Sequence, residues 1–118
     1  MRDRYRLCDQ TVTVYHFENG SATRTVYDKA YLEFGKTQDV GRTGSSETGD
    51  FLLVVPGPSR ACSVGDKVIL GRGPDVPATD VAAWWRSFIP SKVDGLLVVR
   101  KSSVKLWNGE ICHTEAGG

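Results

Sequence analysis

Short runs of apolar residues, interrupted by glycine and proline, recur along the chain. Two of them lie near its middle, at residues 51–55 and 68–70, and the segment between them is broken by a Pro-Gly-Pro sequence and a Gly-Asp pair. Short runs that are rich in β-branched residues and bounded by such turn residues favour strands over helices. We therefore expect these runs to form a central pair of strands in the middle of a sheet, buried on both faces.

A hairpin is predicted from the alternation that precedes this pair. Residues 11–17 alternate, so that Val12, Val14 and His16 share one face of the expected strand and Tyr15 lies on the other. The Asn-Gly pair that follows suits the positive φ angles of a type I′ turn. The chain should return through residues 22–27 and extend to residue 34. Alternation places Val26, Ala30, Leu32 and Phe34 on one face of this extended strand and Tyr27, Lys29, Tyr31 and Glu33 on the other.

Residues 75–89 are predicted to form the helix of the domain. Val81, Trp85 and Phe88 recur at helical spacing on one face, and Asp75 or Thr79 is suited to cap the N-terminus. A proline two residues after Asp75 suits a first turn, and another proline directly after residue 89 ends the pattern.

The rest of the C-terminal part reads as strands. We expect one strand at 96–100, and a second hairpin at 104–107 and 110–114 around another Asn-Gly pair. Residues 1–10 are expected to form a loose lead-in in which Leu7 is tucked in, and residues 115–118 a frayed tail.

Residues 35–50 contain a single large apolar side chain, Val40, together with four glycines and five serines or threonines. Such a segment buries too little apolar surface to offset the entropy of ordering itself. We predict a long flexible loop, and structureless loops of this length in compact domains are usually functional or disordered.

These elements predict one mainly β domain over residues 1–118, a small antiparallel β-barrel or sandwich with one short helix and a long flexible loop. A chain of this length can bury a sufficient core without metals or disulfides. The formal net charge is +1, which gives no global field for nucleic acid. Three widely spaced cysteines indicate a reducing compartment, and we find neither a membrane-spanning run nor a signal peptide. The protein is expected to fold in a cytoplasm.

The chain contains parts of nucleotide-binding and metal-binding motifs, but none of these motifs is complete. The Gly-Lys-Thr at 35–37 lacks the P-loop glycine five residues earlier, where Ala30 stands, and the Gly-Arg-Gly at 71–73 is better explained as a turn. Potential metal ligands have no CxxC or HxxxH spacing, and adjacent residues such as Cys112 and His113 point to opposite faces of a strand. These ligands are Cys8, His16, Cys62, Cys112 and His113.

We therefore expect no catalytic residue, no cofactor and no metal site, and three inert, reduced cysteines. His16 is interpreted as a half-buried strand histidine with one hydrogen-bonded nitrogen rather than a general base.

Two neighbouring tryptophans in the predicted helix have different expected roles. Trp85 belongs to the core face, whereas Trp84 lies about 100° around the helix and is expected to be partly exposed beside Arg86. A half-exposed tryptophan next to an arginine has the composition of an interface anchor, so Trp84 and Arg86 are interface candidates. The alternative is an indole that closes one end of the barrel.

The order of these segments carries a resemblance. The TVTVYH strand, the return strand with its aromatics, the polar loop, FLLVVP, VGDKVILG, the tryptophan segment and the final ICHTEAGG follow one another from about Asp9 to the C-terminus. In this order and spacing the chain resembles the minor capsid or head-to-tail connector proteins of tailed bacteriophages and prophages of Gram-positive bacteria.

The resemblance implies a non-enzymatic virion protein, similar to head-closure or stopper proteins, that is assembled in the cytoplasm of a bacterial host. Its partners would be the portal or adaptor and the tail, and it would form a ring in the virion while staying monomeric or weakly associated when free. No sequence-specific nucleic acid and no membrane are implied. An assembly loop is then expected at 35–50, with polar contacts from Thr37, Gln38, Asp39, Arg42, Thr43 and Ser45. The alternative is a small ligand- or carbohydrate-binding β-barrel domain.

Overall fold

The computed structural model describes residues 8–34, 51–93 and 95–118. Within these residues the chain is mainly β, with seven antiparallel strands and one short helix, which confirms the predicted fold class. The strands are β1 (Gln10–Glu18), β2 (Ser21–Phe34), β3 (Phe51–Pro56), β4 (Lys67–Leu70), β5 (Leu96–Val98), β6 (Lys101–Trp107) and β7 (Glu110–Gly117), and the helix is α1 (Val81–Ser87).

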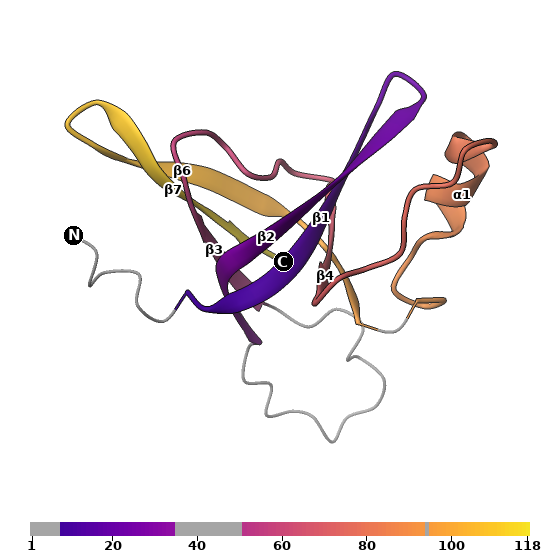
Figure 1. Ribbon diagram of the computed structural model, residues 1–118, viewed down its shortest axis with the longest axis horizontal. Coiled ribbons are helices and arrows are strands. Elements are labelled where there is room, and N and C mark those ends of the chain that lie inside the picture. The colour runs from indigo at the N-terminus through magenta and orange to yellow at the C-terminus, as the bar shows by residue number, and fades with distance from the viewer. Residues whose placement is uncertain (1–7, 35–50, 94) are drawn as a thin grey trace.

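The strands form one curled sheet in the order β5-β4-β1-β2-β3-β7-β6, a half-barrel (Figure 1). The long strand β2 joins its two halves, because it pairs with β1 over most of its length and with β3 near its end. The chain passes from one edge strand to the other within two residues, and Val99 and Arg100 donate backbone hydrogen bonds to Asp66 and Gly117. The edges therefore meet at this corner, while the β1–β2 and β6–β7 hairpins splay apart at the opposite side.

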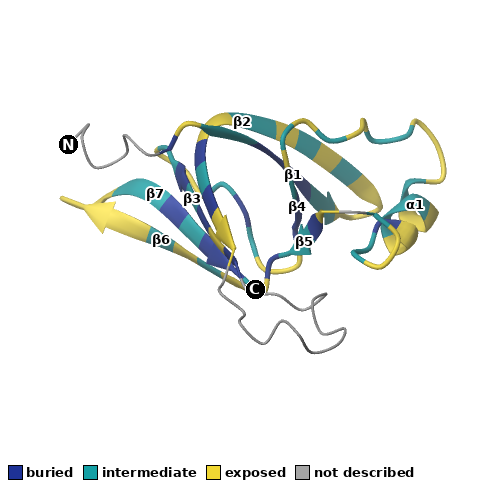
Figure 2. Ribbon diagram, turned by 90° about the horizontal axis from the view of Figure 1, so that it is seen from below, coloured by how far each residue is buried: buried dark blue, intermediate teal, exposed yellow. Residues whose placement is uncertain are grey.

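The concave face of the sheet carries the main core (Figure 2). Its buried members are Val12, Val14, Ala30, Leu32, Phe51, Leu53, Val55, Cys62, Val68, Val99 and Ala116. A second, smaller core lies on the opposite side of β1, where Tyr15, Phe88 and Leu96 are buried beneath α1 and the segments that flank it. Strand β1 is consequently covered on both faces, whereas α1 leaves β6 and β7 uncovered.

Both predicted Asn-Gly turns are present. Asn19 and Gly20 have φ of 53° and 79°, and Asn108 and Gly109 have φ of 54° and 79°. Positive φ at both central residues is the type I′ pattern, whose twist matches that of the flanking strands. The two Asn-Gly pairs therefore predicted two hairpins correctly.

The predicted faces of β2 are wrong in its first half. Gln10 pairs with Ala30 but Val12 pairs with Tyr27, so β2 carries one extra residue between these pairs. This bulge reverses the alternation, and Tyr27 packs against the same core as Ala30 and Leu32. At the strand end Phe34 is 54% exposed.

The prediction that the strands at 51–55 and 68–70 form a central pair is also wrong. Strands β3 and β4 are interior strands, but β1 and β2 lie between them. Neither is buried on both faces, since Leu52 is 40% exposed and Leu70 is 47% exposed. These short apolar runs do not alternate with polar residues, so the sequence did not show that each strand has a solvent-facing side.

Helix α1 is shorter than the predicted 75–89. Asp80, rather than Asp75 or Thr79, occupies the N-cap, with φ of 52° and no side-chain capping bond, and Phe88 is the C-cap. The preceding residues run as an extended segment in which Pro74 accepts a bond from Tyr15 and Val76 packs beneath the helix. Tertiary contacts therefore outweighed the helical spacing before residue 80.

The C-terminal part differs from the prediction in three ways. Strand β5 ends at Val98 instead of residue 100. Strand β6 begins at Lys101 instead of residue 104, and β7 continues to Gly117, so residues 115–117 are paired rather than frayed. Gly117 and Gly118 lie against Phe51, where an added Cβ would come within 2.8 Å and 2.7 Å of its atoms. Most of the lead-in, including Leu7, and the loop at 35–50 lie outside the described residues.

Candidate interaction surfaces

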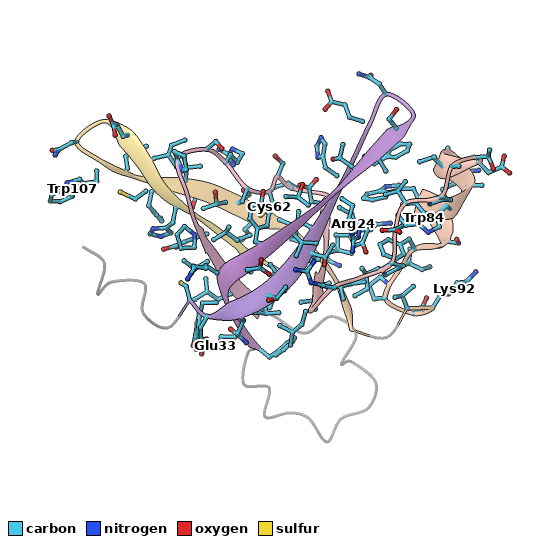
Figure 3. The ribbon with its side chains drawn as sticks, viewed as in Figure 1. Arg24, Glu33, Cys62, Trp84, Lys92 and Trp107 are labelled. Carbon is cyan, nitrogen blue, oxygen red and sulfur yellow. The ribbon has the colours of Figure 1, made fainter. Side chains whose placement is uncertain are left out.

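The β6–β7 hairpin extends beyond the core and ends in an apolar tip. Leu106 is 61% exposed and Trp107 is 56% exposed, and both precede the Asn108-Gly109 turn. Figure 3 shows Trp107 at the far end of the molecule from Trp84 and the helix. Large exposed apolar side chains at the end of a projecting element are typical of contact sites for other molecules.

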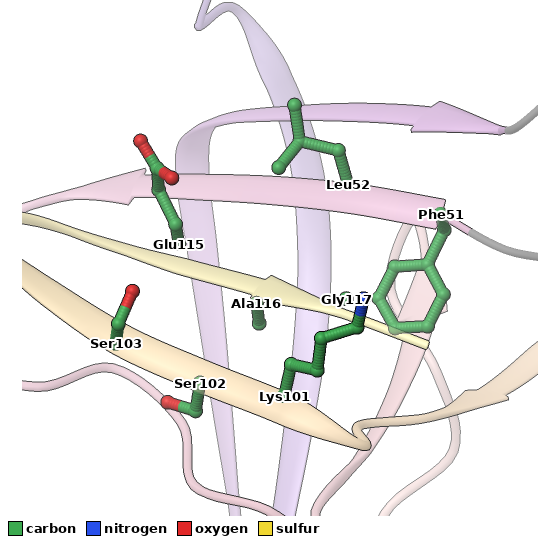
Figure 4. A pocket seen from close by; sticks show the side chains of 8 residues that line it. All are labelled: Phe51, Leu52, Lys101, Ser102, Ser103, Glu115, Ala116 and Gly117. Carbon is green, nitrogen blue, oxygen red and sulfur yellow. The ribbon is translucent and has the colours of Figure 1, made fainter.

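A shallow trough of about 400 Å³ lies at the other end of the same hairpin (Figure 4). Its floor consists of Ala116 and Gly117 of β7, the smallest residues of that strand, and the neighbouring strands β3 and β6 form its sides. The residues that line it are Phe51, Leu52, Lys101, Ser102, Ser103, Glu115, Ala116 and Gly117.

Strand register places this trough on the outer face of the sheet. Leu52, Gly117 and Lys101 lie side by side on adjacent strands, and so do Val54, Glu115 and Ser103. The intervening Leu53 is fully buried in the core. The trough thus combines an apolar side at β3 with a cationic and hydroxyl-bearing side at β6.

Charges around this hairpin are only partly paired. Lys105 Nζ lies 3.8 Å from Glu115 Oε1, and His113 Nε2 lies 3.0 Å from Glu115 Oε2. Lys101 and Glu110 are exposed, and neither forms an ion pair with any described residue. Among the described residues, the trough therefore has a cation without an ion-pair partner and the tip a carboxylate without one.

Trp84 lies in the second core rather than free on the surface. Its ring stacks on Phe88 with centroids 4.5 Å apart and lies 6.0 Å from Tyr15, although part of it remains accessible. Arg86 is exposed on the same helix. These contacts place Trp84 in the second core, on the outer side of β1 rather than at an end of the barrel, and the interface role of Trp84 and Arg86 stays a prediction.

Trp85 covers a buried lysine. Its ring stacks on Phe17 at 5.3 Å, and Lys67 Nζ lies 4.1 Å from the ring centroid. Lys67 also donates a hydrogen bond of 2.8 Å to the Trp85 carbonyl, and burial lowers the pKa of its ammonium group. The bond and the cation–π contact join the last turn of α1 to the start of β4.

The strongest cluster of titratable groups is centred on His16. Its Nδ1 lies 2.6 Å from Asp66 Oδ1 and its Nε2 lies 3.0 Å from Glu18 Oε1, so both ring nitrogens have partners and the expectation of one was wrong. The hydrogen bonds to Asp66 and then Glu18 raise the pKa of the imidazole. Asp66 is buried and also accepts a bond from the Ser63 amide.

A histidine between two carboxylates holds a proton but offers no free nitrogen as a base. Its position suits an electrostatic link between β1 and the turn before β4.

The three cysteines are free thiols, with Cys8 and Cys62 buried and Cys112 partly buried. Burial raises the pKa of the Cys62 thiol to about 12 and also raises that of Cys8. Among the described residues, no three metal-ligating side chains lie close enough together to hold an ion. These thiols have the surroundings of small core residues.

The residues of the hairpin tip and trough were not singled out from the sequence. The strand pattern placed Trp107 correctly beside a turn, and two adjacent large apolar residues at a strand end cannot both face one core. That signal could have identified the tip. The trough depends on the pairing of β3, β7 and β6, which no local pattern contains. The six polar loop residues proposed for assembly lie outside the described residues.

Comparison of the chain with protein-family models, curated proteins and solved structures finds no match. Within the described part of the chain, no helix has the length and apolar character needed to cross a bilayer.

Proposed function

We propose that this protein is a non-enzymatic subunit of the head-to-tail connector of a tailed bacteriophage or prophage, where it forms a ring that joins the portal or adaptor to the tail. The observation that carries the proposal is the projecting β6–β7 hairpin, with Leu106 and Trp107 exposed at its tip. A ring subunit needs a stable domain and apolar surface that lies outside its own core.

The fold and the order of segments support the same role. A small mainly β domain is the architecture that the resemblance implied, and the half-barrel has its core filled by its own side chains. The outer face of β3, β7 and β6, which no other described element covers, adds surface for a neighbour. In this role the virion is the site of function, and assembly takes place in the bacterial cytoplasm.

Disruption of the gene in a bacterium that produces the particles tests this role. We expect heads and tails to accumulate separately, or heads to lose DNA, and expression of the intact chain in trans should restore tailed particles. Tailed, infectious particles formed at normal yield without the protein would overturn the proposal.

The trough favours a second candidate, a small ligand- or carbohydrate-binding domain. Its hydroxyls and charged groups, from Ser103, Lys101 and Glu115, stand beside the apolar Leu52, a combination that suits sugar-like ligands. Thermal unfolding measured with sugars, nucleotides and divalent metals distinguishes this candidate. A ligand that binds only the folded state produces a saturable rise in melting temperature, which Lys101→Ala and Ser103→Ala should diminish.

A further inference from the structure

We propose that the apolar tip of the β6–β7 hairpin of one copy of this chain binds in the trough of the next copy, so that subunits associate head to tail. The inference rests on the proposed function and names the contact that joins neighbouring subunits of the ring. Trp107 is the principal tip residue, and Leu52 and Lys101 are the principal trough residues.

The tip and the trough match in shape. Trp107 projects with more than half of its surface exposed, and the trough of about 400 Å³ has the small Gly117 on its floor and the exposed Leu52 as its apolar side. A tryptophan side chain buries about 150–250 Å² when it is enclosed. An exposed aromatic side chain and a trough with an apolar side that no described residue fills are suited to one another in shape.

The tip and the trough also carry opposite charges. Glu110 pairs with Trp107 across the hairpin tip, and Lys101 lies beside Gly117 in the trough. Neither charge has an ion-pair partner among the described residues. With Trp107 placed in the trough of a second copy, Glu110 comes near Lys101, and the two unpaired charges attract one another.

Geometry excludes the same contact within one molecule. Lys101 and Trp107 are six residues apart on one strand, which corresponds to about 20 Å. Alternation along β6 puts Lys101, Ser103 and Lys105 on the same side of the strand, and beyond the register shift after Lys105 the tip residues are exposed. A contact between two different surface sites repeats from copy to copy, and it closes into a ring when the rotation between copies permits.

The contact is small. Stable protein interfaces bury roughly 1,200–2,000 Å² in total, far more than one tryptophan provides. Pairs of free subunits should therefore be weakly associated, and a closed ring gains from every subunit holding two neighbours.

Photo-crosslinking at residue 107 tests the contact. Trp107 is replaced with p-benzoylphenylalanine, which keeps an aromatic ring at the tip, and this chain is mixed at high concentration with ¹⁵N-labelled wild-type protein and irradiated. We expect labelled peptides from 51–52, 101–103 and 115–117 to carry the crosslink. The same amino acid in place of Leu70, which is also exposed but lies on β4, is the matched control and should not give this pattern.

Exchange of the charges at residues 110 and 101 tests whether Glu110 and Lys101 pair between subunits. Glu110→Lys in the crosslinking chain, or Lys101→Glu in the labelled chain, should each lower the yield at least about threefold, and mixing both variants should restore it. Circular dichroism of each variant verifies that it is folded. The proposal would be overturned by crosslinks to the partner's own tip or to other surfaces, or by the absence of a crosslink. A crosslink yield that does not change with the charge exchange would also overturn it.

The two proposals can fail separately. The crosslink is measured on purified protein, so it can map to the trough even where gene disruption leaves particles intact. That result would support the contact between subunits and contradict the connector role. The opposite result, a neck protein without this crosslink, leaves the role and removes the contact.

Discussion

Gly73 shows how one residue without a side chain permits close packing. A Cβ at this position would clash with Tyr15 Oη and would come within 3.1 Å of Ile69 Cδ1. Tyr15 is fully buried, and its hydroxyl donates a hydrogen bond of 2.6 Å to the Pro74 carbonyl. The Gly71–Gly73 segment that the sequence suggested to be a simple turn is therefore the wall of the second core.

We predict that Gly73→Ala lowers the free energy of unfolding by about 1–3 kcal/mol, because the added methyl group overpacks a filled site. Tyr15→Phe removes the clashing hydroxyl at a cost of about 1 kcal/mol for the lost hydrogen bond. The double variant should be more stable than the sum of the single effects indicates. Urea unfolding of the four proteins measures this coupling, and strictly additive losses would contradict the packing described here.

His16 predicts a pH dependence of stability. Its pKa is raised in the folded protein above the ordinary value of 6.5 by hydrogen bonds to Asp66 and Glu18. The folded state therefore binds the proton more tightly than the unfolded state does. The resulting stabilisation is fully present below about pH 6.5 and is lost as the pH rises through the higher folded-state pKa.

The comparison of wild type with His16→Gln isolates this effect. The side chain of His16 is 42% exposed, so solvent screening limits the difference to about 1 kcal/mol or less. We expect the advantage of the wild type to shrink between pH 6 and pH 9, and Glu18→Gln to reduce its amplitude. An advantage that grows over this range would show that the histidine is not held in its protonated form.

At the scale of elements, α1 and the β6–β7 hairpin use tryptophan in opposite ways. Trp84 packs against Tyr15 and Phe88, whereas Trp107 stands at the hairpin tip with 56% of its surface exposed. Removal of a packed aromatic side chain leaves a cavity, but removal of an exposed one leaves the core unchanged.

Trp84→Ala should therefore lower the free energy of unfolding by about 2–4 kcal/mol, and Trp107→Ala by no more than about 0.5 kcal/mol. Chemical denaturation gives both values, and quenching of tryptophan fluorescence by iodide provides an independent check, because Trp107 should contribute most of the accessible emission. A large stability loss from Trp107→Ala would mean that the tip packs on its own domain.

The elements that the sequence predicted correctly are those with local signals. Alternation over 11–17 and the two Asn-Gly pairs define hairpins within a few neighbouring residues, and the structure confirms them. The bulge that turns Tyr27 inward and the pairing of the tail through Gly117 depend on contacts with distant strands. Neither has a signature in its own segment, and the trough, which needs β3, β7 and β6 together, has none for the same reason.

At the scale of the whole molecule, the two halves of the sheet are covered unequally. Helix α1 and its flanking segments cover β1 and complete a second core, while the outer face of β3, β7 and β6 has no covering element among the described residues (Figure 2). The half of the sheet around β1 thus contributes a second core that stabilises the domain. The half formed by β3, β7 and β6 leaves the tip and the trough accessible to a neighbouring molecule.

The most direct measurement of the central claim is a cryo-electron microscopy reconstruction of the neck of particles from a bacterium that encodes this chain. We expect a ring at the junction of head and tail into which the half-barrel fits, with Trp107 of each subunit in the trough of the next. Particles whose neck contains no density for this chain would contradict the proposed function. A ring whose subunits meet through other surfaces would contradict the head-to-tail contact.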